Sequence, residues 1–189
     1  PAPEEEYNLF SIPFLQAVYT RPVGVSDHTL DPILVPSLSV LVGASIIEKH
    51  FCLERGNRGL DDGYALTPDQ FTTMVEAVRY TETEEYWEGI GRLANSYGEN
   101  RIRTILGSFR KALSPSERPH YAFTKRSVRA SAALGAGTML SEKNCAVLRS
   151  TPAFSPGISP EFYPLILGKR MVRPAGPGEG ITWEHLLTP

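Results

Sequence analysis

Residues 8–81 alternate between segments that favour helices and short β-branched segments that favour strands. The expected helices cover residues 8–19 and 36–44 and a segment that begins after Thr67, and the expected strands cover residues 23–28 and 45–51. Helices and strands that alternate with short connections are typical of parallel βα folds. The order of elements therefore predicts an α/β protein with a parallel sheet.

The last of these helices has the clearest local pattern. Thr67-Pro68-Asp69-Gln70 forms a capping box with proline at the first helical position. Phe71, Met74, Val75 and Val78 follow at positions i, i+3, i+4 and i+7. That spacing predicts one helix face packed on a core.

The second half of the chain changes character. An acidic run and then a basic stretch occupy residues 82–111, and short apolar pieces between Gly- and Pro-rich turns follow residue 120. We therefore expect an α/β domain over residues 1–88, linker helices over 89–120 and a small all-β domain over 121–189.

Composition excludes several classes of protein. The 19 basic and 21 acidic residues give a net charge of −2, so nothing favours binding to nucleic acid or to an anionic membrane. The longest apolar run, around residues 33–44, is interrupted by proline, serine and glycine and is too short to span a bilayer. Cys52 and Cys145 lie far apart and are expected to be reduced, as in a cytoplasmic protein.

Both expected strands end in histidine. Alternate residues of a strand share a face, so Ser26 and His28 point one way, as do Glu48 and His50. Neighbouring strands lie about 4.8 Å apart, and parallel α/β folds place their sites at the C-terminal ends of strands. These four side chains are therefore expected to form a cluster.

The loop after the second strand brings Asp61 or Asp62 toward this cluster. Two imidazoles with open positions suit a divalent metal that also takes water and substrate. Hydrogen-bonded histidines without a metal are the alternative interpretation. Asp27 and Lys49 point to the opposite face and are expected to be structural.

Several of these motifs, taken together, resemble a known family. Gly24-Val25-Ser26-Asp27-His28-Thr29, Ile47-Glu48-Lys49-His50-Phe51 and Gly59-Leu60-Asp61 are similar to the sialic acid synthase family, which comprises N-acetylneuraminate synthases and relatives that make pseudaminic, legionaminic and spore-coat sugars. Residues 121–187 resemble that family's antifreeze-like SAF (β-clip) domain, through Gly135-Ala136-Gly137-Thr138 and Gly157-Ile158-Ser159-Pro160.

The family fold implies a (β/α)₈ TIM barrel followed by the small SAF domain. A whole barrel needs about 250 residues, so the resemblance implies that this chain holds about strands seven and eight and lacks the first six. We expect a partial chain that is inactive alone. The resemblance also implies a homodimer in which the SAF domain covers the partner's barrel.

The resemblance implies a reaction as well. Phosphoenolpyruvate condenses with an N-acetylated amino sugar, N-acetylmannosamine or a relative, to a nine-carbon 2-keto sugar acid and phosphate. A divalent metal (Mn, Mg or Co) is the implied cofactor. The implied roles are metal binding for His28 and His50, proton movement for Glu48, contact with phosphoenolpyruvate for Ser26, and sugar contacts for Asp61, Arg149 and Phe123.

Two departures from the family pattern occur at or next to residues that, by the resemblance, would contact the sugar. Leu60-Asp61-Asp62 stands where the family has Pro-Asp-His, and Arg149 is followed by Ser150-Thr151-Pro152 instead of proline. A non-catalytic carbohydrate-binding or interaction protein that retains the scaffold is therefore the alternative function, and a metal-dependent aldolase on the same barrel is a third. Without the resemblance, Arg149 would be a solvated surface residue and Phe123 a packing residue.

Overall fold

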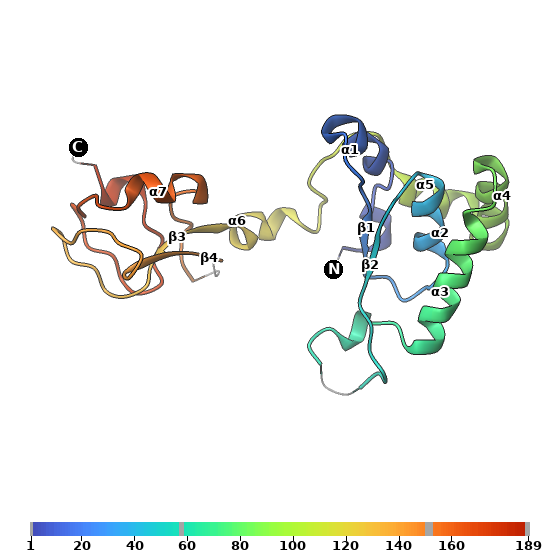
Figure 1. The fold of residues 1–189 in the computed structure, drawn as a ribbon, viewed down its shortest axis with the longest axis horizontal. Coiled ribbons are helices and arrows are strands. Elements are labelled where there is room, and N and C mark those ends of the chain that lie inside the picture. The colour runs from blue at the N-terminus through green and yellow to red at the C-terminus, as the bar shows by residue number, and fades with distance from the viewer. Residues whose placement is uncertain (1, 57–58, 150–152, 188–189) are drawn as a thin grey trace. The chain divides into compact units, whose positions relative to one another are not determined.

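The computed structural model describes residues 2–56, 59–149 and 153–187, with the backbone alone at residues 122–123. The chain divides into two compact units, Pro1–Ser116 (unit 1) and Glu117–Pro189 (unit 2). Figure 1 shows the elements of both. None of the described helices is both long enough and apolar enough to cross a membrane.

Unit 1 contains the alternating elements that the sequence predicts. Its strands are β1 (Val25–Asp27) and β2 (Ile47–Lys49). Its helices are the 3₁₀ turns η1 (Glu4–Glu6) and η2 (Asp62–Tyr64) and the α-helices α1 (Ser11–Tyr19), α2 (Leu34–Leu41), α3 (Pro68–Thr81), α4 (Tyr86–Tyr97) and α5 (Glu99–Leu106). The predicted parallel pairing is confirmed, because β1 pairs with β2 in parallel register, Val25 opposite Ile47.

Local contacts explain where these elements begin. Gly24 precedes β1, and a Cβ there would lie 2.0 Å from the carbonyl oxygen of Ile46, so only glycine lets the two strands approach. Helix α2 begins after Asp31, whose Oδ1 accepts hydrogen bonds from the N–H groups of Ile33 (2.8 Å) and Leu34 (3.1 Å). These bonds satisfy backbone donors that have no partner within the helix.

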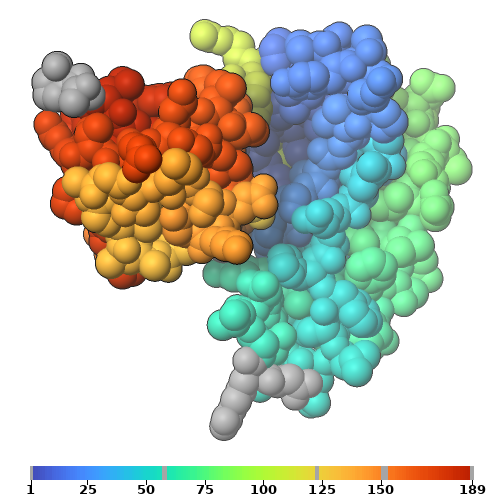
Figure 2. Space-filling view, turned by 60° about the vertical axis from the view of Figure 1, so that its left-hand side comes forward, coloured from blue at the N-terminus to red at the C-terminus, as the bar shows by residue number. Residues whose placement is uncertain are grey.

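Helices α4 and α5 belong to the core of unit 1. The charge pattern predicts linker helices over residues 89–120, whereas in the structure Leu93, Ile102 and Ile105 are almost completely buried beside Leu38. The charged residues of this segment suggested a linker. They lie on the outer faces of these helices, as in the exposed ion pair of Glu99 and Arg103. Unit 1 therefore continues to Ser116, past the boundary expected at residue 88. Figure 2 shows the blue to green atoms of this unit packed together.

The predicted apolar face of α3 is only partly covered. Met74 is buried, whereas Val75 is 41% exposed. A cavity of about 270 Å³ lies beneath the helix, lined by Phe71, Val78 and Ile47 among others. The helix therefore contacts unit 1 through part of the face that its spacing predicts.

Fewer residues of unit 2 form β-strands than the sequence predicts for an all-β domain. Its sheet consists of β3 (Arg126–Ala130) and β4 (Cys145–Arg149), which pair antiparallel. Short helices make up its other described elements: η3 (Arg118–His120), α6 (Tyr121–Thr124), η4 (Pro160–Phe162), α7 (Tyr163–Ile166) and η5 (Trp183–His185). The remaining turn-rich segments form isolated bridges, such as Leu134 with Ala175, because they are too short for full ladders.

Buried aliphatic side chains hold unit 2 together. Val128, Ile158, Met171 and Ile181 belong to one core cluster, each at most 4% exposed. Gly157 passes directly beneath β3, and a Cβ on it would lie 2.1 Å from the carbonyl oxygen of Val128. The Gly-Ile-Ser-Pro turn noted in the sequence is therefore required for the packing of this core.

Candidate functional site

The two histidines at the strand ends lie side by side. The register places Ser26 opposite Glu48 and Asp27 opposite Lys49, so the next residues, His28 and His50, leave the sheet at the same level. Their ring centroids are 5.0 Å apart, with the ring planes tilted by 50°. The adjacency that the sequence predicts is therefore present in the structure.

Ser26 and Glu48 complete this face of the strand pair. The Ser26 hydroxyl donates a hydrogen bond of 2.7 Å to Oε1 of Glu48, and both residues are exposed. His28 and His50 are half-buried. The face thus presents two imidazoles, one hydroxyl and one carboxylate, a set that can bind a metal and an anionic substrate and can move a proton.

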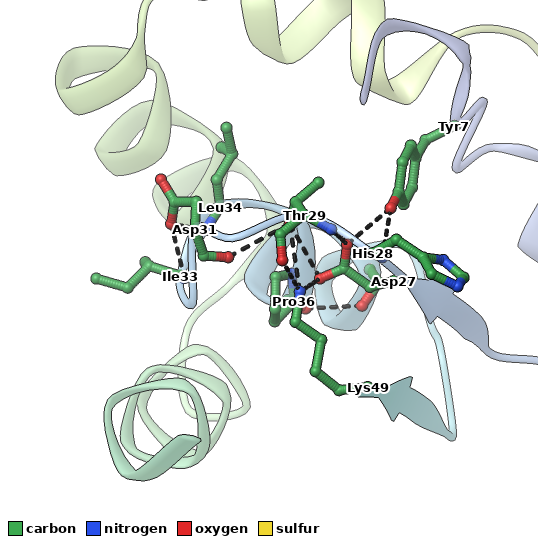
Figure 3. A network of polar contacts seen from close by, with 10 residues as sticks. Tyr7, Asp27, His28, Thr29, Asp31, Ile33, Leu34, Pro36 and Lys49 are labelled. Atoms are coloured by element: carbon green, nitrogen blue, oxygen red, sulfur yellow. Dashed lines mark hydrogen bonds and ion pairs between the residues drawn. The ribbon is translucent and has the colours of Figure 1, made fainter. Parts of the chain in front are cut away.

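The opposite face carries a buried ion pair (Figure 3). Nζ of Lys49 lies 2.6 Å from Oδ2 of Asp27, and the two side chains are 1% and 0% exposed. The Tyr7 hydroxyl donates to Oδ1 of Asp27 at 2.8 Å and accepts from the N–H of His28 at 2.7 Å. Burial and the neighbouring carboxylate of Asp27 raise the pKa of Tyr7, so its hydroxyl keeps its proton. Asp27 and Lys49 therefore have the structural setting that strand alternation predicts.

A pocket of about 490 Å³ opens beside His28. It is lined by Ala2, Pro3, Glu4, His28, Thr29, Leu30 and Tyr64. Tyr64 belongs to η2, in the loop that follows β2, and is not among the site residues predicted from the sequence. Its one sequence signal is its position shortly after the Gly-Leu-Asp motif.

The two aspartates of that loop do not join the histidines in a metal-ligating group. Asp61 is exposed, and Oδ2 of Asp62 accepts a hydrogen bond from the N–H of Gly59 at 2.9 Å. Among the described residues, no group of three or more His, Cys, Asp or Glu side chains could hold a metal ion. The donor set of His28 and His50 fits a divalent ion that takes its remaining ligands from water, substrate or other chain segments.

The two candidate residues of unit 2 are less well defined. Arg149 ends β4 opposite Arg126 and is exposed. The Phe123 side chain and residues 150–152, where the chain departs from the family pattern, lie outside the described residues. Sequence reasoning also missed Tyr7, because no local pattern marks a hydroxyl that bonds 20 residues away.

Comparison with known proteins agrees with this arrangement. The NeuB family profile matches residues 1–86, and the SAF domain profile matches residues 125–187. The chain is a NeuB-family segment followed by a SAF domain. The expected family resemblance is therefore confirmed.

Named relatives of the NeuB family align along almost the whole chain. The spore coat polysaccharide biosynthesis protein SpsE of Bacillus subtilis is 36% identical over 190 residues, which cover 99% of this chain and 48% of that protein. The N,N'-diacetyllegionaminic acid synthase of Legionella pneumophila is 31% identical over 186 residues, covering 98% and 45%. The pseudaminic acid synthase of Campylobacter jejuni is 32% identical over 170 residues, covering 90% and 42%.

A solved structure supports the same assignment. The crystal structure of Bacillus subtilis SpsE matches with a TM-score of 0.82 and 34% identity, covering all of this chain and 51% of that one. The NeuB-family segment and SAF domain together thus span about half the length of the relatives that they match. The structure of the chain is mixed α/β, as expected for this family.

Proposed function

We propose that the whole protein is a phosphoenolpyruvate-dependent sugar-acid synthase. It joins phosphoenolpyruvate to an N-acetylated amino sugar, N-acetylmannosamine or a relative, and releases phosphate and a nine-carbon 2-keto sugar acid. The observation that carries the proposal is the face on which the His28 and His50 rings lie 5.0 Å apart beside the Ser26–Glu48 hydrogen bond. The relatives that are named as legionaminic and pseudaminic acid synthases support the reaction class.

His28 and His50 would hold the divalent ion, Mn, Mg or Co. Such an ion, when bound, supplies Lewis acidity toward a substrate carbonyl. The chain contributes two imidazole nitrogen donors, which follow the ends of two paired strands. A rigid pair of this kind reduces the entropy that is lost when the site is assembled.

Ser26 and Glu48 would serve the phosphoenolpyruvate end of the reaction. The Ser26 hydroxyl is exposed and has one hydrogen to donate, now given to Glu48. When an anionic substrate arrives, this hydrogen can turn to the substrate oxygen, because hydroxyl rotors are free to reorient. Oε1 of Glu48 is then available to take up or return a proton beside the reacting carbons.

The rest of the site would come from Asp61 of unit 1 and from further chain segments. We propose that β1 and β2 are about the seventh and eighth strands of a (β/α)₈ barrel. Among the described residues each pairs only with the other, which leaves one edge of each strand unpaired, and unpaired edges favour further strands. Asp61, Arg149 and Phe123 would contact the sugar, with the SAF domain covering the barrel of the partner in a homodimer.

A second candidate function has one specific observation in its favour. Asp62 stands where the family pattern has histidine, and its carboxylate bonds to the backbone of Gly59 within its own loop. A protein whose sugar side has changed in this way could bind carbohydrate without turning it over. Retention of Ser26, Glu48, His28 and His50 together favours the enzyme, because a binding module has no use for a proton-moving carboxylate beside a metal.

Phosphate release tests the proposal directly. The whole protein is given phosphoenolpyruvate, Mn²⁺ and a series of N-acetylated hexosamines, and inorganic phosphate is measured. We expect release with at least one sugar and none without sugar. A protein that binds one of these sugars in calorimetry but releases no phosphate with any of them supports the carbohydrate-binding function and refutes the synthase.

A further inference from the structure

Tyr7 reaches the end of β1 from another part of unit 1, the segment between η1 and α1. Its hydroxyl donates to Oδ1 of Asp27 at 2.8 Å and accepts from the backbone N–H of His28 at 2.7 Å. We propose that Tyr7 is a positioning residue for the His28 imidazole, acting through the backbone of residue 28. The inference rests on the proposed function, because that function is what requires the two imidazoles to be held together.

The need for this bond follows from the end of the strand. β1 ends at Asp27, so His28 lies beyond the ladder that pairs β1 with β2. A backbone N–H that is half-buried and has left its ladder must find another acceptor or lose a hydrogen bond. The Tyr7 hydroxyl is that acceptor, and it fixes the peptide unit from which the imidazole projects.

The hydroxyl is itself held in one orientation (Figure 3). The Asp27 carboxylate accepts from the Tyr7 hydroxyl, from the N–H of Thr29 at 2.9 Å, from Oγ1 of Thr29 at 3.2 Å and from Nζ of Lys49 at 2.6 Å. Lys49 also donates to the carbonyl oxygen of Thr29. Because the Tyr7 hydrogen is committed to Asp27, a lone pair of its oxygen is left for His28.

His50 is anchored differently. Its carbonyl oxygen accepts from the N–H of Leu66 at 2.9 Å, and the N–H of Cys52 donates to the carbonyl oxygen of Leu66 at 3.0 Å. These are main-chain bonds, which no side-chain substitution except one to proline removes. Loss of the Tyr7 hydroxyl is therefore expected to release His28 and to leave His50 in place. This difference distinguishes a role in positioning His28 from a general contribution to the stability of the fold.

Hydrogen–deuterium exchange of the whole protein tests this asymmetry. Tyr7→Phe removes one oxygen atom, and we expect the His28 amide to exchange at least about tenfold faster while the Leu66 amide is unchanged. Mn²⁺ affinity, measured by electron paramagnetic resonance, should fall by about tenfold, the lower end of the usual effect of a residue that supports a metal ligand. Tyr19→Phe is the matched control, because Tyr19 is 65% exposed on α1.

Three results would overturn the proposal: a His28 amide that exchanges as in the wild type, an unchanged Mn²⁺ affinity, or equal acceleration at His28 and Leu66. If the Tyr7→Phe variant does not fold, hydrogen–deuterium exchange of the wild-type protein tests the proposal. The proposal then requires that the His28 amide is protected from exchange as strongly as the Leu66 amide. A wild-type protein that releases no phosphate refutes the synthase, and the exchange measurement still decides the role of Tyr7.

Discussion

The hydroxyl of Ser26 and the carboxylate of Glu48 meet across two parallel strands, with Oγ 2.7 Å from Oε1. They are direct partners in the register of β1 and β2, so the backbone pairing sets their distance. Hydrogen bonds to an ionised group are about twice as strong as neutral ones. This bond lies on an exposed face, and it places a hydrogen-bond donor beside a proton acceptor.

Substitution of Ser26 should separate substrate binding from folding. Ser26→Ala removes the donor proposed for phosphoenolpyruvate, and a hydrogen bond to a charged group contributes about 1.5–3 kcal/mol. We expect kcat/KM for phosphoenolpyruvate to fall by at least about tenfold, while the free energy of unfolding changes by less than about 0.5 kcal/mol because the site is exposed. Steady-state kinetics of phosphate release measures the first, and urea unfolding the second.

Ser45→Ala is the matched control for this substitution, because Ser45 is also exposed and lies two residues before β2. It should leave kcat/KM unchanged. Equal losses in the two variants would mean that Ser26 has no particular contact with the substrate.

The paired imidazoles make metal binding depend on both strands. His28→Ala and His50→Ala each remove one nitrogen donor, so we expect either change to weaken Mn²⁺ binding by at least about tenfold and to remove metal-dependent phosphate release. His120→Ala, an exposed histidine of η3, should change neither. Treatment of the wild type with a chelator should abolish activity, and added Mn²⁺ should restore it. Full activity in the chelator would contradict the metal site.

The buried ion pair should be far more sensitive than an exposed one. Lys49→Met leaves the Asp27 carboxylate buried without its cation, and such a loss typically costs about 3–5 kcal/mol. Arg103→Met removes an exposed pair with Glu99 and should cost about 0.3–0.5 kcal/mol. Urea unfolding followed by circular dichroism compares the two variants. A similar cost for both would show that the buried pair contributes no more than a surface pair.

Acid should weaken the contact of α4 with the segment that connects it to α3, where Glu84 lies. Hydrogen bonds from Arg92, at 2.7 and 2.8 Å, lower the pKa of Glu84 from its usual value near 4.5. The ionised carboxylate therefore stabilises the fold at neutral pH, and this contribution disappears as the pH falls through the lowered pKa. We expect Glu84→Gln to lose less stability than the wild type when the pH is lowered from 6 to about 3, as measured by urea unfolding at each pH.

Glu76→Gln tests whether this effect belongs to Glu84. Glu76 is an exposed carboxylate on α3. This control should keep the acid sensitivity of the wild type. If both variants follow the wild-type pH profile, the Glu84–Arg92 contact does not contribute to it.

Local sequence patterns were sufficient for the centre of unit 1. Alternation placed His28 and His50 on one face, and the β1–β2 pairing could be inferred from the order of elements, so their adjacency was predictable. The contact of Tyr7 with Asp27 was not, because it joins segments 20 residues apart and has no repeating pattern. The assignment of α4 and α5 to a linker failed because their surface charges obscured the buried face formed by Leu93 and Ile102.

In unit 2, too, local sequence patterns did not predict contacts between distant segments. Glycine and proline marked its turns correctly, but whether the segments between turns pair as strands depends on partners far along the chain. Leu134 reaches Ala175 and Met139 reaches Arg170, each through a single bridge. Patterns within a few residues of sequence carry no information about such partners.

The two histidines differ in how easily a mutation elsewhere in the chain can remove the bonds that hold them. The main-chain bonds that anchor His50 survive any substitution at the residues that make them, except proline, which lacks the N–H. The bond of the His28 N–H goes to a side-chain oxygen, that of Tyr7, and one nucleotide change suffices to turn a tyrosine codon into a phenylalanine codon. If Tyr7 positions His28 as proposed, a single substitution is enough to loosen the first imidazole, whereas the second keeps its main-chain bonds.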